Sequence, residues 1–136
     1  FLESLPGEQM RSGFAEMLKH GLIANPTYWN KLKKLDKLTP EALKDFIKPS
    51  IIEKTRIVLK DPNEKGLRKI LNFGHTLGHA IESFYLDHNK NLRLLHGEAI
   101  AAGMVLEAYL SSYCSGLKMT AVKEIKKTLK KLLLIM

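Results

Sequence analysis

The sequence contains a single cysteine, Cys114, so no disulfide can form within the chain. Disulfides are rare in cytosolic proteins, and one unpaired cysteine therefore favours a cytoplasmic protein. The first residues lack the basic and apolar regions of a signal peptide, which agrees with that location. The sequence also has no uninterrupted run of about eighteen apolar residues, the length that a transmembrane helix needs. We therefore expect no membrane partner.

Arginine is scarce although the chain is basic. The 136 residues include 22 lysines and arginines against 14 acidic residues, a net charge of +8, but the only arginines are Arg11, Arg56, Arg68 and Arg93. Nucleic-acid recognition relies on arginine for bidentate contacts, whereas lysines scattered along helices usually form a solvated face. We therefore expect no nucleic-acid partner.

The sequence also lacks the signals of β-structure. It has no alternating Val, Ile and Thr pattern and no Asn-Gly hairpin. Apolar residues recur instead at helical spacing, which predicts one all-α domain of five to seven helices over residues 1–136. The expected helices are 8–23, 28–35, 39–60 with an interruption at Pro49, 64–85, 96–115, and a lysine-rich last helix.

Local signals mark where these helices begin and end. Asn25, followed by proline, stops the first helix, and Thr39 before a proline and an acid is a typical helix start. Glu98 complements the start of the helix at 96, and Gly116 lies where a helix-ending glycine is usual. Thr120 is expected to cap the last helix. A turn is expected at 61–63 and a loop at 87–95.

Two histidines four residues apart form the first candidate site. On a helix His75 and His79 point the same way, as in many zinc sites. The residues between them are Thr-Leu-Gly, so the glutamate that a zinc protease needs is missing. Gly74 and Gly78 cost about 1 kcal/mol each inside a helix, which indicates close approach by another helix or a ligand. Two core histidines bonded to backbone carbonyls are the alternative.

A polar stripe extends this site. Arg68, Asn72, His75 and His79 follow a spacing of three to four residues and would share one face of the helix 64–85. Such a stripe on an otherwise apolar helix favours the wall of a site for an anionic, hydroxylated ligand. Lys54 is a further candidate for binding an anion.

Other residues extend the metal hypothesis. A neutral His96 at a helix start suits a metal ligand. Glu16 lies in an apolar stretch, where an unpaired carboxylate is costly to bury, so Lys19 or a metal ion is its expected partner. His20 and His88 are expected on the surface or in loops.

Three segments carry a family resemblance: GFAEMLKHGLI, KTRIVLKDPNEKGLRKILNFGHTLGHAIE and LHGEAIAAGM. Together they resemble the 3-dehydroquinate synthase family over about residues 1–120. The resemblance implies its C-terminal helical domain, without the NAD-binding N-terminal domain and with a truncated C-terminal end. The family converts 3-deoxy-arabino-heptulosonate 7-phosphate to 3-dehydroquinate and phosphate in the shikimate pathway, uses zinc or cobalt together with NAD, and is commonly a homodimer.

The resemblance also implies residue roles. It leaves His79 off the metal, as a proton-transfer residue, whereas spacing alone pairs His79 with His75. The implied metal ligands are Glu16, His75 and His96. The implied substrate and catalytic residues are Lys54 and Arg68 for a carboxylate, Asn72 for the phosphate, and Lys19 and Glu64 beside the hydroxyl groups. No cofactor-binding residue for NAD is expected in this chain.

Two alternatives stay open. One is a related sugar-phosphate cyclase of the deoxy-scyllo-inosose synthase type, against which the carboxylate-binding pair Lys54 and Arg68 argues. The other is a non-enzymatic basic helical module that binds RNA or a protein through the lysines of 118–131. If the family applies, we expect the chain alone to be inactive. We also expect an exposed apolar patch formed partly by residues 132–136.

Overall fold

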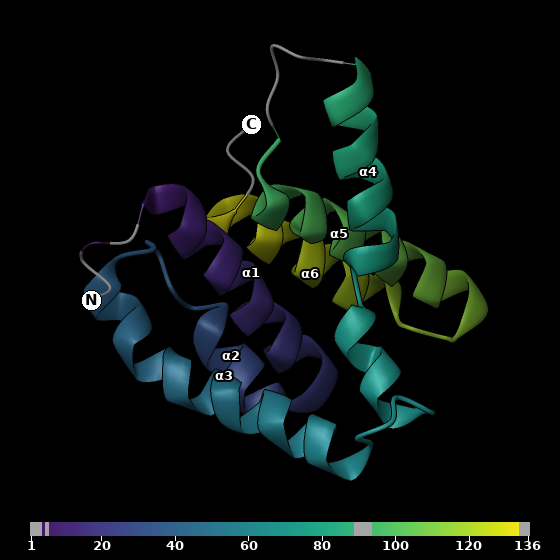
Figure 1. Cartoon of the computed structure of the whole chain (residues 1–136), viewed down its shortest axis with the longest axis horizontal. Helices are drawn as coiled ribbons and strands as arrows, with labels where there is room; N and C mark the ends of the chain where they lie inside the picture. Colours follow the sequence, from purple (N-terminus) through teal and green to yellow (C-terminus); the bar gives the residue numbers. More distant parts are fainter. Residues whose placement is uncertain (1–3, 5, 89–93, 134–136) are drawn as a thin grey trace. The chain divides into compact units, whose positions relative to one another are not determined.

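The computed structural model describes residues 4, 6–88 and 94–133, and the chain forms two compact units that divide between Phe73 and Gly74 (Figure 1). These described residues are mostly helical and contain no strand, which confirms the all-α fold. None of the helices among them is both long and apolar enough to span a membrane. The elements are α1 Gly7–Ala24, α2 Pro26–Leu32, α3 Pro40–Lys60, η2 Leu67–Asn72, α4 His75–His88, α5 His96–Cys114 and α6 Met119–Leu132.

The first unit packs α2 and α3 against α1. Phe14 and Leu18 of α1 are fully buried, together with Leu32 of α2. The predicted stop at Asn25 is confirmed, because α1 ends at Ala24. The Asn25 side chain accepts a hydrogen bond from Tyr28 N and thereby caps α2. Because this capping involves residues close in sequence, the boundary between α1 and α2 can be predicted from the sequence.

Helix α3 begins as predicted but is not interrupted. The Thr39 side chain accepts a hydrogen bond from Ala42 N, so the predicted start is correct. Pro49 lies inside the helix, where it removes one backbone donor, yet the helix runs on to Lys60. The predicted interruption at Pro49 is therefore wrong. Packing against α1, with Leu43 and Ile57 buried on the two sides of the proline, outweighs the lost bond.

The predicted helix 64–85 is also wrong. A short 3₁₀ segment, η2, ends at Asn72, and the chain then breaks at Phe73 and Gly74. Gly74 has a φ of +81°, a conformation that residues with a Cβ rarely adopt, so no regular helix passes through it. The predicted continuous stripe is thereby divided: Arg68 and Asn72 belong to the first unit, and the two histidines to α4.

The second unit is built on α5. Small buried residues on this helix include Ala99, Ala101 and Ala108, and they let the neighbouring helices approach its backbone. Helix α6 lies along α5 (Figure 1). Its apolar face is buried and its lysines are exposed to solvent. The predicted apolar patch is wrong at Leu132 and Leu133, which belong to this buried face, while residues 134–136 lie outside the described ones.

The ends of the last helices are partly as predicted. Gly116 follows α5 with a φ of +75°, in agreement with the predicted helix end. Thr120 does not cap α6, because the helix starts at Met119 and Thr120 lies inside it. The cap position is Lys118, which makes no side-chain capping bond. Glu98 accepts a hydrogen bond from Leu95 N at 3.1 Å and so stabilises the start of α5, as expected.

Glycines bring α4 and α5 into backbone contact. A Cβ placed on Gly103 would lie 2.1 Å from the carbonyl oxygen of Gly74 and 2.6 Å from the nitrogen of Gly78. Gly78 is constrained less severely, since a Cβ there would lie 3.0 Å from the oxygen of Ala99. The predicted close approach to Gly74 and Gly78 is therefore made by another helix, α5.

Candidate functional site

Three imidazoles gather where α4 and α5 begin. His75 and His96 are the first residues of their helices, and His79 lies one turn into α4. The ring centroids are 5.4 Å apart for His75 and His79, 5.8 Å for His79 and His96, and 6.3 Å for His75 and His96. All three rings therefore face one small region, which the close contact of the two helices makes compact.

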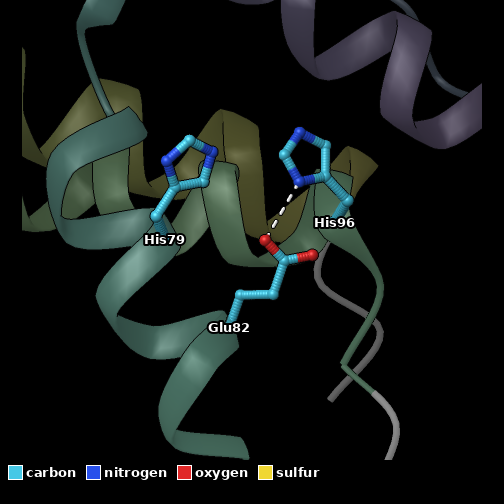
Figure 2. A group of neighbouring side chains, drawn as sticks. All are labelled: His79, Glu82 and His96. Atoms are coloured by element: carbon cyan, nitrogen blue, oxygen red, sulfur yellow. Dashed lines mark hydrogen bonds and ion pairs between the residues drawn. The ribbon is translucent and has the colours of Figure 1, made fainter. Parts of the chain in front are cut away.

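A carboxylate from α4 joins this cluster. Glu82 lies three residues after His79 on the same helix face, and its Oε2 is 3.2 Å from Nδ1 of His96 (Figure 2). Potential ligand atoms of His79, Glu82 and His96 all lie within 4.8 Å of one another. Sequence reasoning missed Glu82. The available signal was its spacing, since positions 75, 79 and 82 share one face of a helix.

A second carboxylate holds the start of α4. Oε2 of Glu107, on α5, accepts a hydrogen bond of 2.7 Å from Gly74 N, and Oε1 accepts one of 3.3 Å from Leu77 N. These backbone donors have no partner within α4 itself, so Glu107 caps the helix from its neighbour. The cap fixes the backbone that carries His75.

The first unit contains a cluster of charged side chains. Nζ of Lys19 donates a hydrogen bond of 2.7 Å to Oε2 of Glu16, so the predicted pair is confirmed. Lys19 is almost fully buried, and burial lowers its pKa although the neighbouring Glu16 opposes the shift. The positive charge of Lys54 acts on Lys19 in the same direction as burial. The unit thus brings together three of the predicted site residues.

Three other predicted residues meet in the loop after α3. Asn72 Nδ2 donates a hydrogen bond of 3.0 Å to Oε1 of Glu64, and Arg68 Nη1 donates one of 2.9 Å to the oxygen of Pro62. Asp61 organises this loop, because its carboxylate accepts hydrogen bonds from the backbone of Arg68, Gly66 and Lys65. Those bonds hold the pKa of Asp61 below its usual range.

His20 is buried, which contradicts its predicted surface position. Only 4% of the residue is exposed, and its Nδ1 is 2.7 Å from the hydroxyl oxygen of Ser50 on α3. Burial lowers the pKa of His20 to about 4, and the charge of Lys19 adds to that shift. No local pattern around His20 indicates its burial, because that burial depends on packing between α1 and α3. His88, at the exposed end of α4, is on the surface as predicted.

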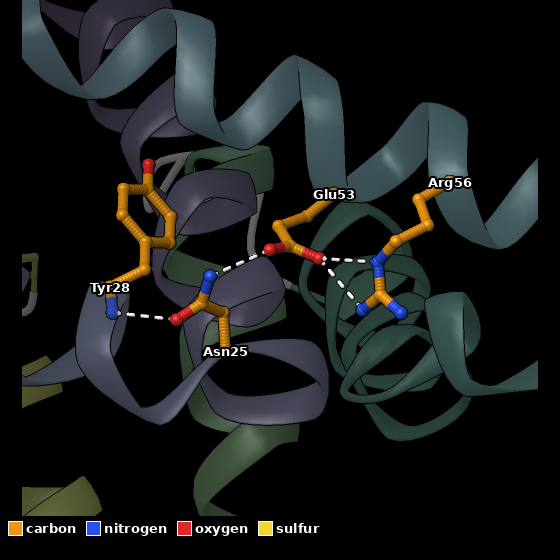
Figure 3. A network of polar contacts seen from close by, with 4 residues as sticks. All are labelled: Asn25, Tyr28, Glu53 and Arg56. Carbon is orange, nitrogen blue, oxygen red and sulfur yellow. Dashed lines mark hydrogen bonds and ion pairs between the residues drawn. The ribbon is translucent and has the colours of Figure 1, made fainter.

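A polar network joins the end of α1 to α3 (Figure 3). Asn25 Nδ2 donates a hydrogen bond of 2.6 Å to Oε1 of Glu53, while Arg56 donates to Oε2 from both Nε and Nη2, at 3.0 and 2.8 Å. Burial raises the pKa of Glu53, but the hydrogen bonds from Asn25 and Arg56 outweigh burial and the pKa is lowered. Every oxygen of this buried carboxylate has a donor, so we assign the network to stability and not to binding.

The donor set of the second unit fits a divalent metal ion. Imidazole nitrogen and carboxylate oxygen are the ligands that zinc and cobalt commonly take in proteins. The described residues place His75, His79, Glu82 and His96 together in one unit, whereas Glu16 belongs to the other unit.

Comparison with known proteins identifies relatives. A family model described as 3-dehydroquinate synthase C-terminal matches residues 13–136. A 3-dehydroquinate synthase of Parabacteroides distasonis is 42% identical over 127 residues, which are 92% of this chain and 35% of the relative. Those of Dictyoglomus thermophilum and Streptococcus pyogenes serotype M6 are 41% and 48% identical, over 94% and 82% of this chain and 36% and 30% of theirs. The chain thus spans about a third of the length of these relatives.

Proposed function

The chain belongs to the 3-dehydroquinate synthase family, matching its C-terminal part, and on this basis we propose that it supplies the metal- and substrate-binding wall of that enzyme. The reaction would convert 3-deoxy-arabino-heptulosonate 7-phosphate to 3-dehydroquinate and phosphate. The observation that supports the proposal is the convergence of His75, His79 and His96, which lie on two helices that touch through glycines. NAD would be bound by the rest of such an enzyme, outside this chain.

The proposed metal ligands are Glu16, His75 and His96. When bound, zinc or cobalt supplies a Lewis acid that polarises a substrate hydroxyl. His79, one turn after His75, would hold or release the proton of a neighbouring hydroxyl, for which an exposed imidazole is suited. Lys19, buried and with a lowered pKa, would donate a hydrogen bond to a hydroxyl on the same side.

The remaining polar residues would hold the charged ends of the substrate. Lys54 and Arg68 would bind the carboxylate, where the planar guanidinium of an arginine makes two parallel hydrogen bonds. Asn72 would contact the phosphate, and Glu64, which accepts a hydrogen bond of 3.0 Å from the Asn72 amide, would lie beside the substrate hydroxyl groups. The role of these residues is positioning, to which a scaffold of helices contributes rigidity.

The first test is the zinc affinity of the chain and of three variants, His75→Ala, His79→Ala and His96→Ala. We expect His75→Ala and His96→Ala to abolish tight binding and His79→Ala to retain it. His88→Ala, a surface histidine on the same helix, serves as the matched control and should bind like the parent. Loss of binding in His79→Ala with retention in His75→Ala would instead assign the metal to His79, Glu82 and His96.

The second test concerns turnover. The chain with NAD should release no phosphate from the heptulosonate phosphate. A chimera in which residues 13–136 replace the matching segment of the Parabacteroides distasonis relative should release it. Arg68→Ala in that chimera should raise KM, because it removes a contact with the substrate carboxylate. Preference of the chimera for a sugar phosphate without a carboxylate would contradict the assigned substrate and favour a related cyclase.

A further inference from the structure

Glu82 has no role in the site proposed above, yet it lies against one of the proposed ligands. Its Oε2 is 3.2 Å from Nδ1 of His96, and the other ring nitrogen lies on the side of the ring away from the carboxylate (Figure 2). The contact links two helices, since Glu82 is on α4 and His96 is the first residue of α5. The Glu82 carboxylate therefore lies where it can determine which nitrogen of His96 carries the hydrogen.

The chemistry of the pair fixes the proton. A neutral imidazole carries one N–H, and an ionised carboxylate only accepts hydrogen bonds. When the ring is neutral, Nδ1 therefore carries the hydrogen that Glu82 accepts, and the lone pair is on Nε2. Histidines that bind metals commonly donate their second N–H to a carboxylate in this way, which fixes both the tautomer and the orientation of the ring.

Burial does not hold the imidazole ring of His96 in place. The side chain of His96 is 49% exposed, whereas that of Glu82 is 27% exposed. The backbones beneath them are held firmly, because a Cβ on Gly78 or Gly103 would collide with the opposite helix. With the backbones fixed and the ring exposed, the hydrogen bond to Glu82 restrains rotation of His96.

We propose that Glu82 is a positioning residue for the metal site: it holds the hydrogen on Nδ1 of His96 and so presents Nε2 to the ion. The proposal rests on the proposed function only in that His96 binds the metal. It differs from the alternative that Glu82 is itself a ligand, which the clustering of His79, Glu82 and His96 also permits.

The experiment compares the chain with Glu82→Ala and with Asp87→Ala, an exposed acid on the same helix that serves as the matched control. Long-range ¹H–¹⁵N correlation spectra of the metal-free proteins identify the tautomer of His96 at a pH where the ring is neutral. We expect the Nδ1–H tautomer in the parent and in Asp87→Ala, and a shift toward Nε2–H in Glu82→Ala. Glu82→Gln, whose amide oxygen still accepts a hydrogen bond, should restore the parent tautomer.

Metal binding supplies the second measurement. Zinc affinity, from competition with a chromophoric chelator, should fall about 10- to 100-fold in Glu82→Ala and stay unchanged in Asp87→Ala. The visible spectrum of bound cobalt should keep its shape, because a positioning residue leaves the number of ligands the same.

Three results would overturn the proposal. These are an Nε2–H tautomer in the parent, an unchanged tautomer in Glu82→Ala, and a cobalt spectrum whose coordination number changes in that variant. If the parent chain binds no zinc, the proposed metal function fails for this chain. The tautomer comparison, made without metal, then decides the role of Glu82 by itself.

Discussion

Replacing Gly103 by alanine would place a methyl group at the closest approach of α4 and α5. The added carbon would lie 2.1 Å from the oxygen of Gly74, 2.6 Å from the nitrogen of Gly78 and 2.9 Å from its Cα. All three atoms belong to the backbone, so no side chain can rotate away. Since ordinary contact begins near 3.4 Å, the helices must separate by about 1.3 Å, the difference between 3.4 and 2.1 Å.

The energetic consequence follows from three contributions. Overpacking of a close contact costs about 1–3 kcal/mol, and backbone atoms place this case at the upper end. Separation would also stretch the 2.7 Å bond from Gly74 N to Glu107. The alanine offsets about 1 kcal/mol of this through its better helix propensity. We therefore expect Gly103→Ala to lower the free energy of unfolding by about 2–3 kcal/mol.

Urea denaturation followed by circular dichroism measures this change, while the fluorescence of Trp29, the one tryptophan, reports on the first unit alone. The matched control is Gly13→Ala, in the middle of α1, where an added Cβ has no neighbour within 4 Å. That variant should gain about 0.5–1 kcal/mol. If Gly103→Ala proves as stable as Gly13→Ala, the close approach of the two helices is refuted.

Two further predictions concern Glu107, which caps α4, and the buried His20. Glu107→Gln should lower the free energy of unfolding by about 1 kcal/mol in urea denaturation, because a neutral amide caps α4 less well, and an unchanged value would contradict the cap. Burial lowers the pKa of His20 to about 4, from 6.5, so the unfolded chain binds the extra proton between these values. The stability that His20 contributes is thus complete above pH 6.5 and falls by about 3 kcal/mol as the pH drops to 4. His20→Gln should flatten that part of the pH profile, and an identical profile would show that the ring is not buried in its neutral form.

The features that were predicted correctly depend on neighbours in sequence. Thr39 bonds to a backbone group three residues away, as does the side chain of Asn25. The pairing of Lys19 with Glu16 spans one helical turn. Such contacts form within a single segment of chain, so residue type and spacing are enough to predict them.

The errors depend on contacts between helices. The apolar periodicity continues past Gly74 and so predicts one helix. The helix is broken there because Gly74 adopts a positive φ where it packs against Met104 of α5. Pro49 has the opposite effect, because it predicts a break that packing on α1 overrides. His20 is buried, and its partner Ser50 lies thirty residues later in the chain. The sequence next to Gly74, Pro49 and His20 does not indicate which distant residues they will contact.

The site itself shows both kinds of information in one place. The spacing of the histidines, which Glu82 shares, can be read from the sequence, but the partners of the two carboxylates cannot, because each acts on the opposite helix. Glu107 of α5 holds the start of α4 at Gly74, next to His75, and Glu82 of α4 holds His96, where α5 begins. Each helix therefore orients the first histidine of the other, and the glycine contact between them sets the distance at which both carboxylates reach. The arrangement of the imidazoles follows from residues of the second unit alone. A change in any of these contacts should therefore alter metal affinity more than it alters the arrangement of the first-unit residues that would bind the substrate.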